Sequence, residues 1–258
     1  MISVVQLGTI DYSTGLRLQQ KLVELRKDNR IGDVLLLLEH TPVITLGRNA
    51  KAKNILATND HLARCGVEVF ECNRGGDVTF HGPGQLVGYP IFDLRGFPSE
   101  DGKRKTLGAI EYVRRLEDVL IRTCADFRIP AERVAGLTGV WTTQNTPGKI
   151  AAIGVHISRG VSSHGFALNI NTDLSFFDFI VPCGITSKPV TAMQKELNTT
   201  PSLEEVAHSI ARNFGVVFHC QVLWLESLDG LLGQTVGVPL KEPQELRELH
   251  QRDETFWA

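Results

Sequence analysis

The sequence predicts an α+β fold, with a mixed, largely antiparallel sheet flanked by helices. Short apolar segments typical of strands follow one another over residues 34–92 and again over 149–171, and no regular crossover helices separate them. Amphipathic segments long enough for a major helix occur near residues 13–29, 106–127 and 202–214. Parallel neighbours need a crossover connection, so most strand pairs are expected to be antiparallel, with the helices on one side of the sheet.

The first third of the chain is expected to hold most of the strands. Ser13 or Thr14 is predicted to cap a helix that runs to about Asn29. A short helix is expected near residues 58–65, because Gly66 is a favourable residue just past a helix end. The strands of this part are expected at residues 4–7, 34–39, 43–46, 67–71, 78–81 and 85–92.

The rest of the chain is expected to contribute two helices, a hairpin and one further strand. Strands at 149–158 and 162–171 are predicted to form a hairpin around Arg159-Gly160. A strand is expected at 216–223, and the polar tail from Glu242 is expected to be a surface helix. Thr106 is predicted to open a helix with Ile110, Val113, Leu116, Leu120, Cys124 and Phe127 on its buried side. Ser202 is predicted to cap a helix with Leu203, Val206, Ile210 and Phe214 on its buried side.

The length and composition favour one domain over residues 1–258. The chain has 258 residues, 42% hydrophobic and 22% charged, which is ordinary for a soluble globular protein and enough for a sizeable core. No Pro/Ser/Gly-rich linker divides it and no repeat is visible. Residues 201–258 could form a small C-terminal appendage.

Charge and cysteine content exclude several classes of partner and location. The net charge is −2, without a dominating basic field, so no nucleic-acid partner is expected. No apolar run approaches ~20 residues, so no membrane span is expected. The N-terminus lacks the features of a signal peptide. The five cysteines are an odd number without a CxxC pair, which indicates reduced thiols in the cytoplasm and argues against a metal site.

The most informative segment is the glycine-rich stretch 74–85. Its glycines stand at positions 75, 76, 82 and 84, where they would let another molecule approach the backbone closely. Val78 and Phe80 alternate with Thr79 and His81, as on the two faces of a short strand. The segment therefore predicts either the wall of a binding site or a hairpin that binds nothing.

Cys183 is the cysteine best placed to act as a nucleophile. It lies in a predicted Pro-Cys-Gly turn, where a thiol can face a cleft, although a free cysteine is more often inert. A nearby base would have to favour its thiolate, and the candidates are His81, His156, His164 and Lys149.

Lys149 opens a strand of small residues, where burial would favour its neutral amine and let it exchange protons; a solvated lysine is the alternative. A group of small residues near this strand would leave room for a long apolar ligand, or would equally permit close packing: Ala151, Ala152, Gly154, Gly165 and Ala167.

Four segments in order resemble one family closely. They are Arg74–His81 with Gly84, Gln85 and Tyr89; Lys149–Gly154; His164–Asn169; and Pro182–Ile185. Together they resemble the octanoyltransferases of protein lipoylation, the lipoate-protein ligase B family. The resemblance covers roughly residues 34–185. It implies a fold like the catalytic domains of biotin and lipoate protein ligases.

The resemblance also implies a reaction. An octanoyl group would pass from the thioester of octanoyl-acyl carrier protein to Cys183, with Lys149 as its acid/base partner, and then to a lysine ε-amine. The acceptors would be apo lipoyl domains of 2-oxoacid dehydrogenases and the glycine cleavage H protein. No cofactor or metal is implied, and a monomer is expected. The substrate-binding residues carried over by motif are Arg74, Gly75, Gly76, Asp77, Val78, Thr79, Phe80, His81, Ala152, Ile153, Gly154, Gly165, Phe166 and Ala167.

Three alternatives remain open from the sequence. An ATP-dependent lipoate or biotin ligase shares the fold but needs no cysteine. An amidotransferase would move octanoyl groups between lipoyl-bearing proteins. A non-catalytic module would bind acyl-proteins and use Cys183 only structurally. Lys149 and Cys183 together favour the transferase, and His81 is expected to shape the site rather than relay protons.

Overall fold

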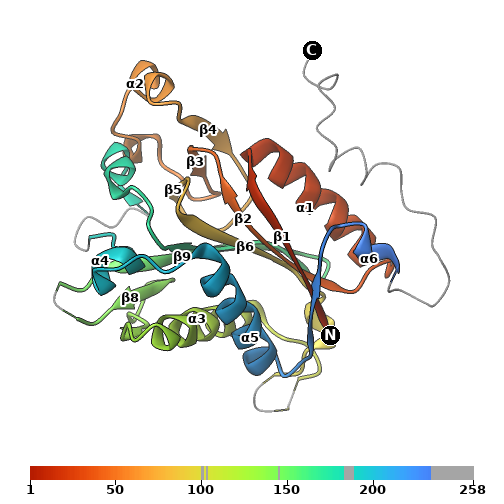
Figure 1. Ribbon diagram of the computed structural model, residues 1–258. Helices are drawn as coiled ribbons and strands as arrows, with labels where there is room; N and C mark the ends of the chain where they lie inside the picture. The colour runs from red at the N-terminus through yellow and green to blue at the C-terminus, as the bar shows by residue number, and fades with distance from the viewer. Residues whose placement is uncertain (100–101, 103, 145, 183–188, 234–258) are drawn as a thin grey trace.

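The structure is a computed structural model of the 258-residue chain, and it describes residues 1–99, 102, 104–144, 146–182 and 189–233. Within these residues a large sheet of eight strands forms the centre, in the spatial order β11-β1-β2-β6-β10-β9-β8-β7 (Figure 1). These strands are β1 (Ile2–Ile10), β2 (Asp33–His40), β6 (Gln85–Ile91), β7 (Ala131–Glu132), β8 (Val140–Thr142), β9 (Lys149–Ser158), β10 (Val161–Asn169) and β11 (Val222–Leu225).

The large sheet is mixed and largely antiparallel, which confirms the predicted fold class. Only β1 pairs in parallel, with β2 on one side and β11 on the other. The other neighbours are antiparallel, including the predicted hairpin of β9 and β10, in which Gly165 lies opposite Gly154.

A second, smaller sheet was not predicted as a separate unit. It consists of β4 (Glu68–Glu71), β3 (Val43–Leu46) and β5 (Val78–His81), in that order. Its core contains Ile44, Val78 and Phe80, packed against helix α2 (Asn59–Arg64) and the 3-10 segment Leu174–Phe179. The glycine-rich segment of the sequence therefore belongs to this small sheet.

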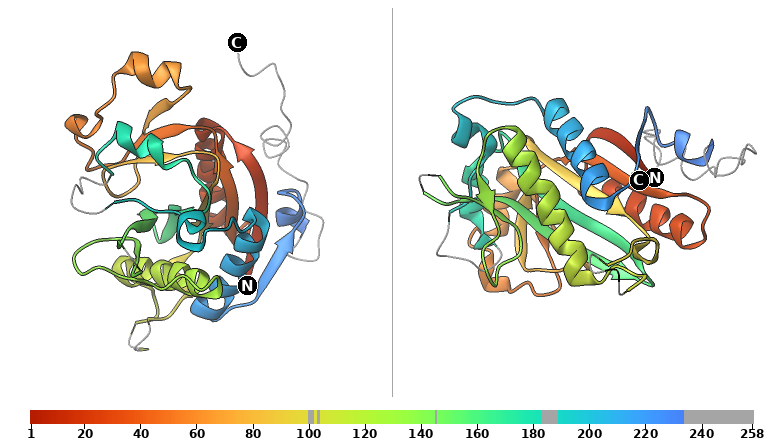
Figure 2. Two further views of the ribbon diagram at one scale, coloured as in Figure 1. Left: turned by 60° about the vertical axis from the view of Figure 1, so that its left-hand side comes forward. Right: turned by 90° about the horizontal axis from the view of Figure 1, so that it is seen from below.

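Helices cover both faces of the large sheet, so the expectation of helices on one side is wrong (Figures 1 and 2). Leu36 and Leu38 of β2 pack toward α1 (Tyr12–Lys27). Leu35 and Leu37 point to the other face, where α3 (Ala109–Asp126) and α5 (Leu203–Phe218) pack together. Because side chains alternate along a strand, the continuous apolar run of β2 serves two cores at once.

Several predicted boundaries move for local physical reasons. The N-cap of α1 is Asp11, whose carboxylate accepts a hydrogen bond from Thr14 N at 2.8 Å. Helix α3 starts at Ala109 rather than Thr106, and Ile110 in its first turn is 80% exposed instead of buried. Its buried side instead includes Tyr112, Leu116, Glu117, Val119 and Leu120.

The C-terminal part also corrects one strand. The predicted strand at 216–223 is wrong over its first half, because α5 continues to Phe218, which packs in the main core. Ser202 caps α5 as predicted, within a capping box completed by Glu205. Strand β11 then joins the large sheet, α4 (Met193–Leu197) precedes α5, and α6 (Gly230–Gly233) follows β11. The helix predicted from Glu242 lies outside the described residues.

Candidate active site

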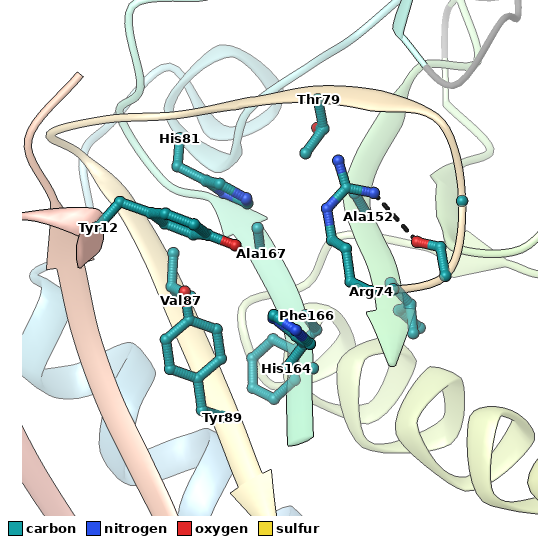
Figure 3. A pocket seen from close by; sticks show the side chains of 15 residues that line it. Tyr12, Arg74, Thr79, His81, Val87, Tyr89, Ala152, His164, Phe166 and Ala167 are labelled. Atoms are coloured by element: carbon teal, nitrogen blue, oxygen red, sulfur yellow. Dashed lines mark hydrogen bonds between the residues drawn. The ribbon is translucent and has the colours of Figure 1, made fainter. Parts of the chain in front are cut away.

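The candidate site is a pocket between the large sheet and the loop that leads into β5 (Figure 3). It encloses about 460 Å³ of empty space, counting the open solvent at its mouth. Most of the residues predicted to bind substrate line it. The lining residues are Tyr12, Arg74, Gly75, Gly76, Thr79, His81, Val87, Tyr89, Ala152, Ile153, Gly154, His164, Gly165, Phe166 and Ala167.

Small side chains make the hollow, and glycines let the backbone close around it. Ala152 of β9 lies directly opposite Ala167 of β10. A Cβ on Gly154 would lie 2.7 Å from the backbone oxygen of Gly75, and a Cβ on Gly165 would lie 2.1 Å from that of Gly88. Ala152 and Ala167 therefore line the pocket, and these glycines permit close approach of backbone segments.

Arg74 is a structural part of the pocket wall. Its guanidinium donates to the Thr45 carbonyl at 2.6 Å and to Thr45 Oγ1 at 2.9 and 3.1 Å. It also donates to the Gly75 carbonyl at 3.0 Å, the bond drawn in Figure 3. A buried guanidinium needs such partners, because burying an unpaired charge is costly. Arg74 thereby joins the pocket loop to β3 of the small sheet.

Strand alternation divides the remaining motif residues into two groups. Thr79 and His81 face the pocket, whereas Val78 and Phe80 pack in the core of the small sheet. Asp77 also lies outside the pocket lining. Its carboxylate accepts hydrogen bonds from Asn54 Nδ2 at 2.5 Å, from Val78 N at 2.9 Å and from Lys51 N at 3.2 Å. Asp77 therefore fixes the loop around Asn54.

A chain of amides fixes the ring of His81. The side-chain nitrogen of Gln85 donates to Phe80 O at 3.2 Å and to Asn169 Oδ1 at 2.9 Å, which leaves its oxygen to accept from His81 Nδ1 at 2.7 Å. His81 Nδ1 therefore carries the proton, and Nε2 is an acceptor. The chain continues from Asn169 Nδ2 to the carbonyl of Thr191 at 2.9 Å.

The histidines around the pocket are buried in their neutral forms. Desolvation lowers the pKa of His81 to about 3, helped by the neighbouring His40 and Arg74. Desolvation likewise lowers the pKa of His40 to about 4 and that of His164 to about 3. The carbonyl of Ile10 accepts from His40 Nδ1 at 2.9 Å, so the hydroxyl of Tyr89 donates to Nε2 at 2.6 Å. These rings serve as fixed, uncharged walls at neutral pH.

These histidines predict that stability falls in mild acid. Their pKa values in the folded protein lie below the unfolded value of about 6.5. Below that pH the unfolded chain therefore binds more protons than the folded protein, and the free energy of unfolding falls. Each of the three should cost about 2 kcal/mol of unfolding free energy at pH 5. Urea denaturation at pH 7.5 and pH 5 measures the loss, and equal midpoints would contradict it.

Lys149 reaches the pocket side of the sheet because of a β-bulge. Val140 lies opposite Ala151 and Trp141 lies opposite Lys149, so Ile150 is an extra residue in β9. Ile150 and Ala151 both point into the core under α3 and α5. The bulge thus returns Lys149 to the opposite face, which also carries Ala152 and Gly154 of the pocket. The Lys149 side chain is 8% exposed, so the solvated alternative is wrong.

Cys183 lies outside the described residues, but both flanks of its segment are held beside the site. On one flank, Val181 N donates to the carbonyl of Asn54 at 2.8 Å. On the other, the Lys149 backbone donates to Pro189 O at 2.8 Å and accepts from Thr191 N at 3.0 Å. The first flank is thus joined to the Asp77 loop and the second to the Gln85–Asn169 chain.

These contacts predict that Asp77→Ala lowers the turnover number without weakening substrate binding in the pocket. Loss of the carboxylate frees Asn54, and with it the flank at Val181. We expect kcat for the predicted acyl transfer to fall about tenfold with little change in KM for the predicted donor, because small misplacements of reacting groups are costly. Asp60→Ala, on exposed α2, is the matched control. A tenfold rise in KM at constant kcat would contradict this role.

Sequence reasoning missed two lining residues. Tyr12 comes from the first turn of α1, about 60 residues before the glycine-rich segment, and its ring lies parallel to that of His81 with centroids 6.3 Å apart. Val87 lies in a fully buried strand, where its apolar side chain looks like an ordinary core residue. Among the residues that the structure describes, no three His, Cys, Asp or Glu side chains gather as metal ligands.

Solved structures share the fold. A bipartite lipoate protein ligase from Thermoplasma acidophilum superposes with a TM-score of 0.67 at 18% identity, over 88% of this chain and 87% of that one. Lipoate-protein ligase A bound with ATP gives a TM-score of 0.66 at 15% identity, over 88% and 89%. A biotin protein ligase from Aquifex aeolicus gives 0.51 at 13% identity, over 84% and 70%.

Curated relatives are much closer in sequence. The octanoyltransferase of Koribacter versatilis is 61% identical over 253 residues, 98% of each chain. That of Acidobacterium capsulatum is 60% identical over 240 residues, 90% of this chain and 96% of the relative. The family described as "Lipoyl protein ligase A/B catalytic domain" matches residues 11–215. The chain therefore belongs to the octanoyltransferase family, within the lipoyl protein ligase A/B catalytic domain.

Proposed function

We propose that this protein moves an octanoyl group from octanoyl-acyl carrier protein to the ε-amine of a lysine on lipoyl domains. The observation that carries the proposal is the position of Lys149. This buried amine lies on the same sheet face as the pocket floor, three residues before Ala152, or about 10 Å along the strand. That span suits an extended eight-carbon chain whose carbonyl lies near Lys149 and whose tail lies in the pocket.

The chemistry proceeds in two acyl transfers. The Cys183 thiolate attacks the donor thioester, and the carrier thiolate leaves and takes up a proton, which Lys149 can supply. The lysine amine of the acceptor then attacks the Cys183 thioester, loses a proton to the neutral Lys149 amine and releases the thiolate. A thioester is already activated, so no nucleotide and no cofactor are required. The assignment of Cys183 is supported by its motif and by the two anchored flanks of its segment.

The pocket suits the acyl tail better than a charged ligand. Val87, Ala152, Phe166 and Ala167 give it apolar surface, and the histidines of its wall are uncharged at neutral pH. Three residues predicted to bind substrate shape the pocket wall. Arg74 does so through the hydrogen bonds of its guanidinium, and Gly76 and Gly154 do so through close backbone contacts. Asp77, Val78 and Phe80 support that wall from outside the lining.

The proposed acceptors are apo lipoyl domains of 2-oxoacid dehydrogenases and the glycine cleavage H protein. The Thermoplasma ligase of the same fold belongs to a lipoylation system that includes its E2 lipoyl domain, which supports this class of acceptor. We propose that the chain works as a single catalytic domain and as a monomer in the cytoplasm. In the described part of the chain, no helix has both the length and the apolar character to cross a membrane.

The decisive assay omits nucleotide. The protein is incubated with octanoyl-acyl carrier protein and apo lipoyl domain, and octanoyl-lysine is measured by mass spectrometry. We expect transfer without ATP and none from free octanoate with ATP. The opposite pattern would favour a ligase. Transfer only when octanoylated protein replaces the carrier as donor would favour an amidotransferase.

A further inference from the structure

The side chain of Lys149 lies in a cradle made by Gly139 and Trp141. Its Nζ is 5.2 Å from the centroid of the Trp141 indole, within the range of a cation–π contact. Trp141 is 1% exposed and Lys149 is 8% exposed, so water screens this contact little. The two residues face each other across β8 and β9, directly at the bulge.

Gly139 leaves room for the lysine stem. A Cβ at this position would lie 2.8 Å from Lys149 Cε and 2.7 Å from the carbonyl of Ala151, and the backbone φ is +131°. The Gly139 N–H donates at 3.2 Å to Glu117, a fully buried carboxylate that also accepts from Arg114 at 2.7 Å and Arg133 at 2.9 Å. The floor of the cradle is therefore fixed by helix α3.

The indole N–H of Trp141 is buried, and no hydrogen-bond partner for it occurs among the described residues. Burial of an unpaired donor is unfavourable, and a phenylalanine or leucine would avoid that cost. The packing of the site therefore does not account for an indole at this position. The ring face instead accounts for the indole, since indole is the strongest aromatic partner for a cation.

We propose that Trp141 is a positioning residue, whose ring face holds the Lys149 ammonium in place for proton exchange during acyl transfer. The inference rests on the proposed function, in which Lys149 exchanges the proton. Removal of the ring face would let the lysine stem shift in the cradle, so the amine would be less well aimed at the reacting groups.

The test compares Trp141→Leu, which removes the ring face, with Trp141→Phe, which keeps a face and removes the unpaired N–H. For Trp141→Leu we expect kcat to fall about tenfold with little change in KM for the acyl donor, because Trp141 is not part of the pocket lining. Trp141→Phe should recover part of the lost kcat. Trp224→Leu, on edge strand β11, is the matched control for loss of an indole.

An unchanged kcat in Trp141→Leu would overturn the proposal, as would a Trp141→Phe protein whose kcat falls as far as that of Trp141→Leu. If Lys149→Ala retained full activity, the proposed role of the lysine would fail instead, so the two failures are distinguishable. A second measurement serves if Trp141→Leu does not fold. With Trp224 and Trp257 changed to Phe, the emission spectrum of Trp141 should change when Lys149→Met removes the ammonium from its ring face. An emission spectrum that Lys149→Met leaves unchanged would contradict the cradle.

Discussion

Replacement of Cys183 by serine should lower nucleotide-independent octanoyl transfer by ~10³-fold or more, the scale on which loss of a covalent nucleophile acts. A thiol with an ordinary pKa of ~8.5 reaches the thiolate form with modest help, whereas a serine hydroxyl does not ionise near neutral pH. Steady-state transfer rates with octanoyl-acyl carrier protein measure the effect.

The chain supplies a matched control for this substitution. Cys65, at the C-terminal end of α2, is partly exposed and is not among the residues that line the pocket, so Cys65→Ser should leave the rate unchanged. A Cys183→Ser protein with full activity would show that the acyl group never resides on that sulfur. The alternative of a non-catalytic binding module would then regain support.

Replacement of Lys149 by alanine should lower kcat about 10²- to 10⁴-fold, the range of a positioned general acid–base. Binding of the donor should be partly retained, because the pocket floor at Ala152 and Gly154 stays in place. The pH dependence is the more specific readout, and the parent rate should vary across pH 6–9.

Lys195→Ala, on the exposed face of α4, controls for loss of a lysine. The thermal unfolding of both variants should also be measured, because Lys149 is buried and its loss changes the local packing. A parent rate that stays constant from pH 6 to 9 would argue against proton exchange by Lys149, whatever the fall in rate of the alanine variant.

Much of the fold could be predicted from local signals in the sequence. The hairpin around Arg159-Gly160, the buried strand at 34–38 and the Ser202 cap depend on residues close together in the chain, and the structure reproduces them. Two features depended on distant contacts instead. The apolar run of β2 serves cores on both faces, and the strands around residues 43–81 form their own sheet.

The candidate site shows the same division. The motif residues could be named from the sequence, and strand alternation correctly separates Thr79 and His81 from Val78 and Phe80. The contribution of Tyr12 could not be predicted, because only the packing of α1 on the sheet brings it there. The bulge at Ile150 was also hidden, since it exists only relative to the partner strand β8. Without it, periodicity would place Lys149 in the core under α3.

The most direct test of the account is to trap the acyl-enzyme. The protein is mixed with octanoyl-acyl carrier protein alone, quenched in acid and digested, and the peptide containing Cys183 is analysed by mass spectrometry. The account predicts one octanoyl group on Cys183 that disappears when apo lipoyl domain is added, with octanoyl-lysine formed in equal amount. Octanoyl-lysine formed at full rate while Cys183 stays unmodified throughout would contradict it.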